Sequence, residues 1–293
     1  MASSLAASSR WRRMKKRESP GCEALLRRLE PYCTAACARF LRRKSDQDRV
    51  WYTGCPGDGV SALLIRSRQS LFPVFNGQTA IPAPRFLNRF PGKRPLHAIQ
   101  GLRQDTELLE KALEPGYAAG DRIDYDLMIL DPEPDSEPQR EGLRALLHRG
   151  PPGLGLRKPG ISDLEKLFPL QAAYEQEEVL PRGAEFSPLS SRLSLEHVIR
   201  REHILAAELD GRLVAKINTN ALSFTRYQLG GVYVLPGYRG LGIATAMTAA
   251  LVLELAEEGR GTALFVKKRN APARAVYRRL GFRTIGDYRI CYY

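Results

Sequence analysis

The sequence predicts a two-domain α/β protein, and three observations support that fold class. Strand-like and helix-like segments alternate along most of the 293 residues. Two stretches interrupt this periodicity: 131–138, rich in proline and acidic residues, and 150–155, rich in glycine and proline. A β-branched run at 232–235 ends in a glycine-rich turn that opens a long helix. A strand, a turn and a helix in that order are typical of an α/β domain.

The N-terminal half is predicted to hold a basic flexible arm, residues 1–20, and an α/β domain of unknown role, residues 21–149. Apolar periodicity predicts helices at 22–44, 104–113 and 139–148, and strands at 50–53, 62–66, 70–75, 96–100 and 123–130. This order loosely repeats that of the C-terminal half without its glycine-rich turn. At 100–105 there is a single glycine, with an acidic residue where a phosphate would bind.

The C-terminal domain, residues 150–293, is predicted to alternate short strands with helices. Ser162 followed by Glu165 has the spacing of a capping box, and Asp210-Gly211 is a strong hairpin signal. The expected strands are 154–158, 204–209, 213–221, 227–235 and 262–266, with two final strands in 283–293, and the expected helices are 162–179, 195–201 and 242–258.

The turn at 239–245 has the composition of an anion-binding loop. Gly240 and Gly242 allow the backbone to approach a ligand closely. The first amides of the helix that begins near Ile243 have no intrahelical partner and lie at the positive end of its dipole. Phosphate is therefore the expected ligand of this turn.

Two common phosphate-binding loops do not fit this turn. A P-loop requires Gly-Lys followed by Ser or Thr, and neither tripeptide occurs in the chain. A dinucleotide fingerprint requires a third glycine, where Thr245 stands, and an acidic residue about 20 positions further on. Glu254 and Glu257 belong to the same predicted helix and do not meet that requirement.

Two motifs in the correct order indicate a family. Residues 239–244 fit Q/R-x-x-G-x-G/A, and after a helix and an apolar strand residues 270–282 fit N-x-x-A-x-x-x-Y-x-x-x-G-F. Together they resemble the GNAT superfamily of acyl-CoA N-acyltransferases. The resemblance spans nearly all of 150–293 and implies a GNAT-type mixed sheet with flanking helices. The N-terminal domain resembles the degenerate copy that precedes a GNAT domain in some bacterial proteins.

The resemblance implies acetyl-CoA as co-substrate and an amine of a small molecule or protein as acceptor. It assigns the backbone amides of 239–245 to the pyrophosphate, the Val234 N–H to the thioester carbonyl and Asn270 to the pantetheine arm. Asparagine is also a favoured helix N-cap, and Asn270 can serve both purposes. The coenzyme-binding residues expected are Val232, Val234, Arg239, Gly240, Leu241, Gly242, Ile243, Ala244, Thr245, Asn270, Ala273 and Tyr277.

The resemblance makes Tyr277 the candidate general acid, because a neutral phenol can protonate the departing thiolate. The structural alternative is a buried helix aromatic packed on Phe282. The general base departs from the family pattern, since Gly231 stands where many members carry a glutamate, and it follows Gly230 in a pair that favours a bulge. The general base must then be another carboxylate. The leading candidates are Glu178 and Glu208, followed by Glu175 and Glu177. For each of them, a solvated surface charge is the more frequent role of a glutamate.

The net charge of +13 is unevenly distributed. Residues 1–44 hold 12 basic and 3 acidic residues, 45–150 hold 13 and 15, and 151–293 hold 20 and 14. A cationic C-terminal domain suits a ligand that carries several phosphates. Nucleic-acid binding through the arm is not favoured, because no basic stretch is interleaved with aromatic residues.

The remaining composition excludes several classes of protein. Five cysteines without C-x-x-C spacing and four scattered histidines indicate neither a disulfide framework nor a metal site. No run of 18 apolar residues exists, so no membrane span is expected. Free thiols in a reducing compartment are the default for these cysteines, and a cytoplasmic location is expected. The Arg- and Ser-rich start leaves open a mitochondrial transit peptide, a disordered arm or an upstream start codon assigned too early.

An N-acetyltransferase is therefore the leading functional hypothesis. A non-catalytic acyl-CoA sensor is the first alternative, because the usual glutamate is missing while Tyr277 is present. A nucleic-acid-binding protein led by its basic arm is the second. The acceptor amine is not specified by any of these residues.

Overall fold

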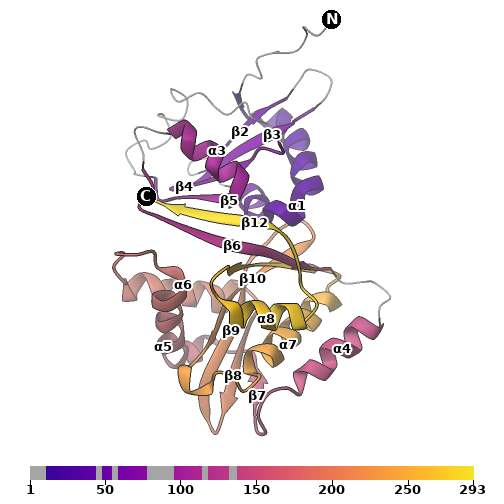
Figure 1. The fold of residues 1–293 in the computed structure, drawn as a ribbon, viewed down its shortest axis with the longest axis vertical. Coiled ribbons are helices and arrows are strands. Elements are labelled where there is room, and N and C mark those ends of the chain that lie inside the picture. The colour runs from indigo at the N-terminus through magenta and orange to yellow at the C-terminus, as the bar shows by residue number, and fades with distance from the viewer. Residues whose placement is uncertain (1–10, 44–47, 55–58, 78–95, 114–117, 132–136) are drawn as a thin grey trace, which may run out of the picture. The chain divides into compact units, whose positions relative to one another are not determined.

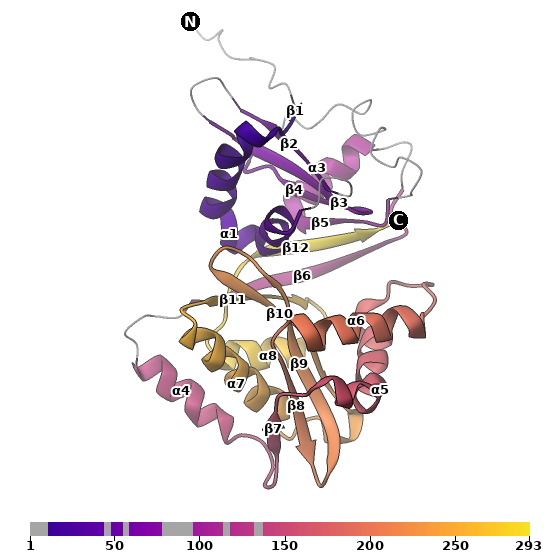
Figure 2. The same cartoon turned by 180° about the vertical axis from the view of Figure 1, so that it is seen from behind.

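The computed structural model describes residues 11–43, 48–54, 59–77, 96–113, 118–131 and 137–293 (Figures 1 and 2). The chain forms two compact units, 1–125 with 286–293, and 126–285. The expected boundary was at 149/150, whereas this division assigns residues 126–131 and 137–149 to the second unit and the last eight residues to the first. The first ten residues of the basic arm, and Cys55, lie outside the described ranges.

In its described ranges the first unit contains a sheet and two helices, close to the positions expected for them. Its strand order is β1-β2-β3-β4-β5-β12. Its strands are β1 (Arg12–Arg13), β2 (Asp48–Thr53), β3 (Ala62–Ser67), β4 (Ser70–Val74), β5 (Ala98–Leu102) and the end of β12 (Arg283–Tyr292), and its helices are α1 (Ser19–Leu41) and α3 (Arg103–Leu113). Apolar side chains of α3 pack with Leu64, Leu71 and Ile99 of the sheet.

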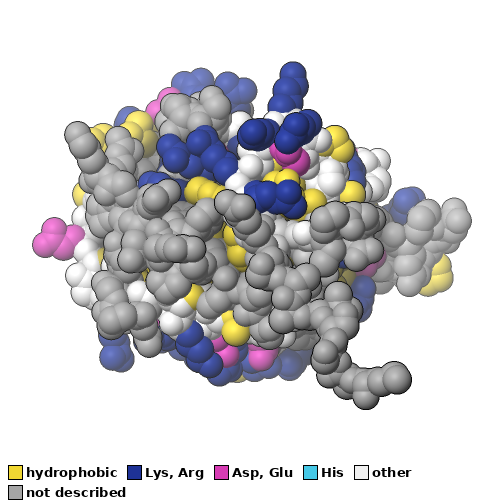
Figure 3. All heavy atoms as spheres, turned by 90° about the horizontal axis from the view of Figure 1, so that it is seen from above, with side chains coloured by type: hydrophobic (Ala, Val, Ile, Leu, Met, Phe, Trp, Pro, Cys, Tyr) yellow, Lys and Arg dark blue, Asp and Glu magenta, His cyan; other side chains and the backbone are white. Residues whose placement is uncertain are grey.

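Part of the predicted flexible arm has defined structure. Arg12 and Arg13 form β1 and pair antiparallel with Tyr52 and Trp51 of β2. A 3₁₀ turn, Lys16–Glu18, leads directly into α1. In Figure 3, described Lys and Arg side chains are most frequent over the upper part of the view, and others lie along its lower edge.

The prediction of two final strands was wrong, since 283–292 is one strand, β12. Its residues 288–292 pair antiparallel with 98–102 of β5. The chain therefore ends inside the first unit, and sequence periodicity does not indicate which strand a segment will pair with.

The second unit carries the predicted GNAT-type order of strands and helices. Its strand order is β6-β11-β10-β9-β8-β7. Its strands are the end of β6 (Asp121–Leu130), β7 (Gly155–Arg157), β8 (Ile204–Leu209), β9 (Arg212–Leu222), β10 (Arg226–Val234) and β11 (Gly261–Lys267). Its helices are α4 (Glu137–Leu147), α5 (Leu164–Tyr174), α6 (Pro188–Arg201), α7 (Ile243–Glu257) and α8 (Ala271–Arg279).

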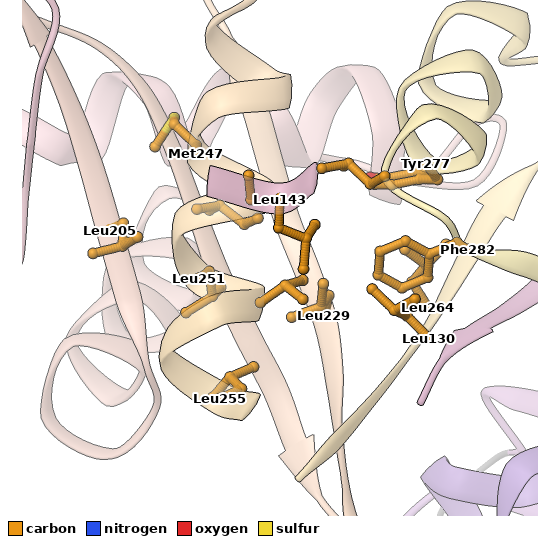
Figure 4. Close-up of a cluster of buried hydrophobic side chains, with 14 of the residues drawn as sticks. Leu130, Leu143, Leu205, Leu229, Met247, Leu251, Leu255, Leu264, Tyr277 and Phe282 are labelled. Atoms are coloured by element: carbon orange, nitrogen blue, oxygen red, sulfur yellow. The ribbon is translucent and has the colours of Figure 1, made fainter. Parts of the chain in front are cut away.

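The helices of this unit form two separate apolar clusters with the sheet. Leu205, Leu229 and Leu264 of the strands pack with α4, α7 and α8 in the larger cluster (Figure 4). Ile204 and Ala206, which alternate with Leu205, pack with α5 and α6 instead. Because successive strand residues face opposite sides of a sheet, α5 and α6 cover the face opposite to α7.

The entry to α5 differs from the predicted capping box. Ser162 lies inside a 3₁₀ turn, η2 (Ile161–Asp163), that precedes the helix. The Asp163 carboxylate accepts the Gly160 N–H at 2.9 Å and is held by Arg157 at 2.8 Å. An ion pair with β7 therefore sets this start, and spacing along the chain does not reveal it.

Two further helices differ in extent from the expectation. The predicted helix 195–201 is the second half of α6, which begins at Pro188 after Ser187, whose hydroxyl accepts the Ser190 N–H at 3.3 Å. The predicted helix 162–179 ends as α-helix at Tyr174 and continues as one π-helical turn, η3 (Glu175–Val179). Such turns within α-helices are frequent at functional sites.

Leu143 tests the packing of α4 on this unit. Its side chain is 5% exposed and lies in the cluster formed with α7 (Figure 4). Leu143→Ala is expected to lower the free energy of unfolding by about 2–5 kcal/mol. Leu193→Ala, on α6 and 55% exposed, is the control and should change it by less than about 0.5 kcal/mol. Urea unfolding measures both, and equal effects would contradict the packing of α4.

Candidate functional site

The sheet opens between β10 and β11. The two strands pair in parallel only over Arg226–Gln228 and Gly261–Ala263, and no further pair joins them in the described chain. Leu235 N–H, just after β10, donates to Val214 of β9 at 2.9 Å. Successive amides of a strand point to opposite sides, so the Val234 N–H is directed away from β9, toward the diverging strand. An extended ligand that carries amide groups could pair with this edge, as expected for pantetheine.

The turn after β10 presents a row of amides without partners. The first helical hydrogen bond of α7 runs from Ala246 N–H to Gly242 O at 3.0 Å. Within the described residues, no group accepts from the amides of 240–245. Gly240 and Gly242 both have φ of +81°, a left-handed conformation that favours glycine. Six consecutive free amides at the start of a 15-residue helix have the geometry that suits an anion.

The two glycines of this turn have different roles, which the sequence did not reveal. A Cβ on Gly240 would meet nothing within 4 Å, so this position faces open space where a phosphate can approach. A Cβ on Gly242 would lie 2.0 Å from the Arg149 carbonyl oxygen. Gly242 is therefore required by packing within the protein, because any side chain there would collide with the Arg149 backbone.

The π-helical turn η3 contacts the turn side of the opening through Glu177. Its carboxylate accepts from Arg239 at 2.8 Å and from the Tyr233 hydroxyl at 3.1 Å. The Arg239 hydrogen bond is the main cause that lowers the pKa of Glu177. Arg239 also donates to Val234 O at 3.0 Å, so it lies along the edge where coenzyme was expected.

The next residue of η3, Glu178, contacts the opposite side of the opening. Its carboxylate pairs with Lys267 of β11 at 3.1 Å and accepts from Asn270 at 3.3 Å. Asn270 also caps α8, because its side-chain oxygen accepts the Ala273 N–H at 3.1 Å. The two glutamates thus link η3 to both diverging strands, and Glu178 lies beside the coenzyme residues assigned from the motif.

Tyr277 lies on α8 with its side chain 8% exposed. Its ring packs edge-on against Phe282, with centroids 5.8 Å apart (Figure 4). Among the described residues its hydroxyl has no hydrogen-bond partner. Burial is the main cause that raises the pKa of Tyr277, followed by Tyr174 and Glu178. The phenol therefore stays protonated at neutral pH and can donate to a developing thiolate.

Glu208 lies away from this group. It is in β8, opposite Leu213 of β9, and its carboxylate is bound by Arg157 of β7 at 3.2 Å. Strand β9 separates it from β10. Of the two leading candidate bases, the structure brings only Glu178 near Tyr277.

The predicted bulge in β10 is confirmed, and it reveals a residue that sequence reasoning missed. The register between β10 and β9 shifts between Gly230 and Tyr233, and Gly231 has φ of +60°. Lys216 of β9, fully buried, donates to Gly231 O at 3.0 Å. Its one sequence signal is a lysine within the apolar strand pattern 213–217.

The corresponding turn of the first unit is blocked by a carboxylate. Asp105, in the first turn of α3, is 3% exposed and accepts the Phe75 N–H at 3.0 Å. Burial raises the pKa of Asp105 to about 6. A carboxylate at this position repels a phosphate, as expected for a domain without a coenzyme site.

The described residues show neither a metal centre nor a membrane span. No group of three or more His, Cys, Asp or Glu side chains in those ranges could hold a metal ion. None of the helices in the described part of the chain is long and apolar enough to cross a bilayer.

Comparisons with known proteins agree with this geometry. Residues 167–282 match the model of the Acetyltransferase (GNAT) family. No curated protein matches the chain at a significant level.

Several solved structures are similar over both units. A Drosophila protein is 14% identical over 97% of this chain and 99% of its own, with a TM-score of 0.63. A tandem GNAT protein from the clavulanic acid biosynthesis pathway is 15% identical over 97% and 98%, with a TM-score of 0.55. A GCN5-related N-acetyltransferase from Sphaerobacter thermophilus is 17% identical over 98% and 96%, also at 0.55. At these identities the likeness shows the fold.

Proposed function

We propose that this chain, whose residues 167–282 form a domain of the GNAT acetyltransferase family, moves an acetyl group from acetyl-CoA directly to an amine of a small molecule or protein. The observation that carries the proposal is the free amides of 240–245 next to the diverging strands β10 and β11. They provide an anion site and an unpaired strand edge side by side, which suits a ligand with a pyrophosphate and an amide-bearing arm.

The residues fit such a co-substrate. The amides of 240–245 would hold the pyrophosphate, and the Val234 N–H would donate to the thioester carbonyl as it becomes an oxyanion. Asn270 would contact the pantetheine arm while it caps α8. Tyr277 would give its proton to the departing thiolate. Arg239 and Asn270 donate to Glu177 and Glu178, so a co-substrate that binds Arg239 and Asn270 would compete with these contacts.

The first unit is proposed to be a catalytically silent domain. Asp105 at its turn supports this, because a buried carboxylate excludes a second phosphate ligand. A cytoplasmic location is also proposed, because Cys22, Cys33, Cys37 and Cys291 carry free thiols, which persist in reducing compartments.

A non-catalytic acyl-CoA sensor is the second candidate function. Two observations favour it. Gly231 stands where many family members have the glutamate that acts as base, and Glu177 and Glu178 are already held in ion pairs with Arg239 and Lys267. A sensor would bind acetyl-CoA without turning it over.

Thiol release separates the two functions. The full chain is incubated with acetyl-CoA and a panel of alkylamines, arylalkylamines, amino acids and lysine peptides, and free CoA thiol is measured. We expect release above the rate of spontaneous hydrolysis with at least one class of amine. Binding of acetyl-CoA without release for any amine would favour the sensor, and no binding at all would refute both.

A further inference from the structure

Lys216 is a fully buried lysine next to the proposed acetyl-transfer site. It lies in β9 between Ala215 and Ile217, whose side chains belong to the α7 cluster. Because strand residues alternate, Lys216 faces the opposite side, toward α5. Its cross-strand neighbours are Tyr233 of β10 and Ala206 of β8, which pack on that side. An isolated buried amine is costly, so its partners determine its charge.

Lys216 has partners for two protons. Its Nζ donates to Gly231 O at 3.0 Å and to Asn218 Oδ1 at 3.0 Å. Among the described residues, the third direction has only the Tyr174 ring, whose centroid is 4.8 Å from Nζ. A charged ammonium has three protons to donate, whereas a neutral amine has two protons and one lone pair. The neutral form therefore matches the contacts.

The surrounding charges do not restore the ammonium. Glu175 of η3 is the carboxylate that favours it, and that carboxylate accepts from Gln171 at 2.6 Å. The other titratable groups packed around Lys216 are the phenols Tyr174 and Tyr233. Burial outweighs Glu175 and lowers the pKa of Lys216 to about 7. The neutral amine, with its free lone pair, is therefore accessible near neutral pH.

Lys216 also takes the place of the missing glutamate. A Cβ built on Gly231 would lie 1.8 Å from Asn218 Oδ1 and 2.8 Å from Lys216 Nζ. No side chain fits at 231 while these two groups are present. At the place where many family members have a carboxylate on the strand equivalent to β10, this chain therefore has the amine of Lys216, which belongs to β9.

We propose that Lys216 is the proton acceptor of the transfer reaction. This inference rests on the proposed N-acetyltransferase function. Tyr174 lies between the proposed base and acid, since its ring faces Lys216 and its phenol adds to the raised pKa of Tyr277. Its oxygen accepts the Gly231 N–H at 3.3 Å, and in the proposed reaction this hydroxyl, or one water, would carry the proton from the opening to the buried amine.

The protons balance over the whole acetyl-transfer reaction. The ammonium of the acceptor passes one proton to the Lys216 lone pair and becomes a neutral amine. That amine forms the N–C bond to the thioester carbonyl carbon, and the C–S bond breaks with its electron pair on sulfur. The thiolate takes the Tyr277 proton, the new amide loses its extra proton to the tyrosinate, and Lys216 returns its proton to solvent.

An NMR titration tests the protonation of Lys216 without coenzyme or acceptor. The full chain is labelled with ¹³C at lysine Cε, and the lysine signals are followed from pH 5 to pH 11. We expect one signal to titrate near neutral pH and to be missing in Lys216→Met. If every lysine signal titrates near its ordinary pKa of about 10, the proposal is wrong. This result does not depend on whether the chain is an acetyltransferase.

Kinetics test whether the lone pair is used. With the panel amine that gives the fastest thiol release, the pH profile of kcat/KM should fall below about pH 7 in the unmodified chain. Lys216→Met should lower kcat/KM about 100-fold at pH 7 and abolish that acidic limb. Lys216→Arg, which keeps a cation but accepts no proton, should be equally slow. Lys166→Met, at an exposed position on α5, is the control and should match the unmodified chain.

The outcomes separate the two proposals. If Lys216→Arg turns over like the unmodified chain, a positive charge suffices and Lys216 is not the base. A fall in rate that is uniform with pH, with the acidic limb retained, indicates a structural role and also overturns the inference. Absence of thiol release by the unmodified chain with every amine refutes the proposed function itself, whatever the titration shows.

Discussion

Tyr277→Phe is expected to lower kcat by about 100-fold or more while the Kd for acetyl-CoA changes little. The substitution removes one oxygen atom that has no hydrogen-bond partner among the described residues, and it keeps the ring. The edge-on contact with Phe282 is therefore retained, and the free energy of unfolding should change by about 1 kcal/mol or less. A structural role of Tyr277 therefore predicts an unchanged kcat on loss of this oxygen, whereas the role of general acid predicts a large decrease.

Single-turnover thiol release with saturating acetyl-CoA measures this effect on the chemical step, and thermal unfolding provides the control for stability. Phe282→Leu is a matched variant that disturbs the same aromatic contact without touching the phenol, so it should affect stability more than kcat. Water can supply a proton to a leaving thiolate. A decrease in kcat below tenfold in Tyr277→Phe would therefore remove the role of general acid from this residue.

Gly240→Ala is expected to weaken acetyl-CoA binding at least tenfold, a loss of about 1.4 kcal/mol or more. The new methyl group would point into space that is open in the protein, where the pyrophosphate must approach the amides of the turn. The fold should survive, because the added Cβ meets no atom within 4 Å and the cost is that of an alanine at φ of +81°.

Gly259→Ala is a close control for this variant. Gly259 follows the other end of α7, has φ of +68°, and a Cβ there would also meet nothing within 4 Å. It therefore imposes similar backbone strain far from the turn, and we expect unchanged coenzyme affinity. Isothermal titration with CoA measures both variants. Equal Kd values for Gly240→Ala and Gly259→Ala would refute the assignment of the turn as the pyrophosphate site.

The sequence pattern was sufficient to predict most helices, strands and turns, because these elements depend on residues that are close together in the sequence. The Asp210-Gly211 turn adopts φ of +50° and +74°, as a tight hairpin requires, and joins β8 and β9 as predicted. The glycine-rich turn and its helix begin where the spacing of Gly240 and Gly242 predicts. These features depend on backbone preferences of a few neighbouring residues, which a single sequence records directly.

The site was only partly predictable, because its key contacts join residues far apart in the chain. Asn270 and Tyr277 were found through a motif within one helix. The pairs that link Glu177 to Arg239 and Glu178 to Lys267 depend on the π-helical turn that ends α5, and no local spacing reveals them. The buried position of Lys216 is of the same kind.

The sequence by itself determined the α/β class, the order of the elements, the glycine-rich turn that opens α7 and the phenol on α8, since each follows from short-range periodicity, glycine conformation or motif spacing. Only the tertiary structure decided which strand the last residues pair with, that Gly242 is held against Arg149, and which charged groups meet at the opening of the sheet. Lys216 shows the reason. Burial and partners set the charge of an amine, and both are supplied by β10 and α5 rather than by its neighbours in sequence.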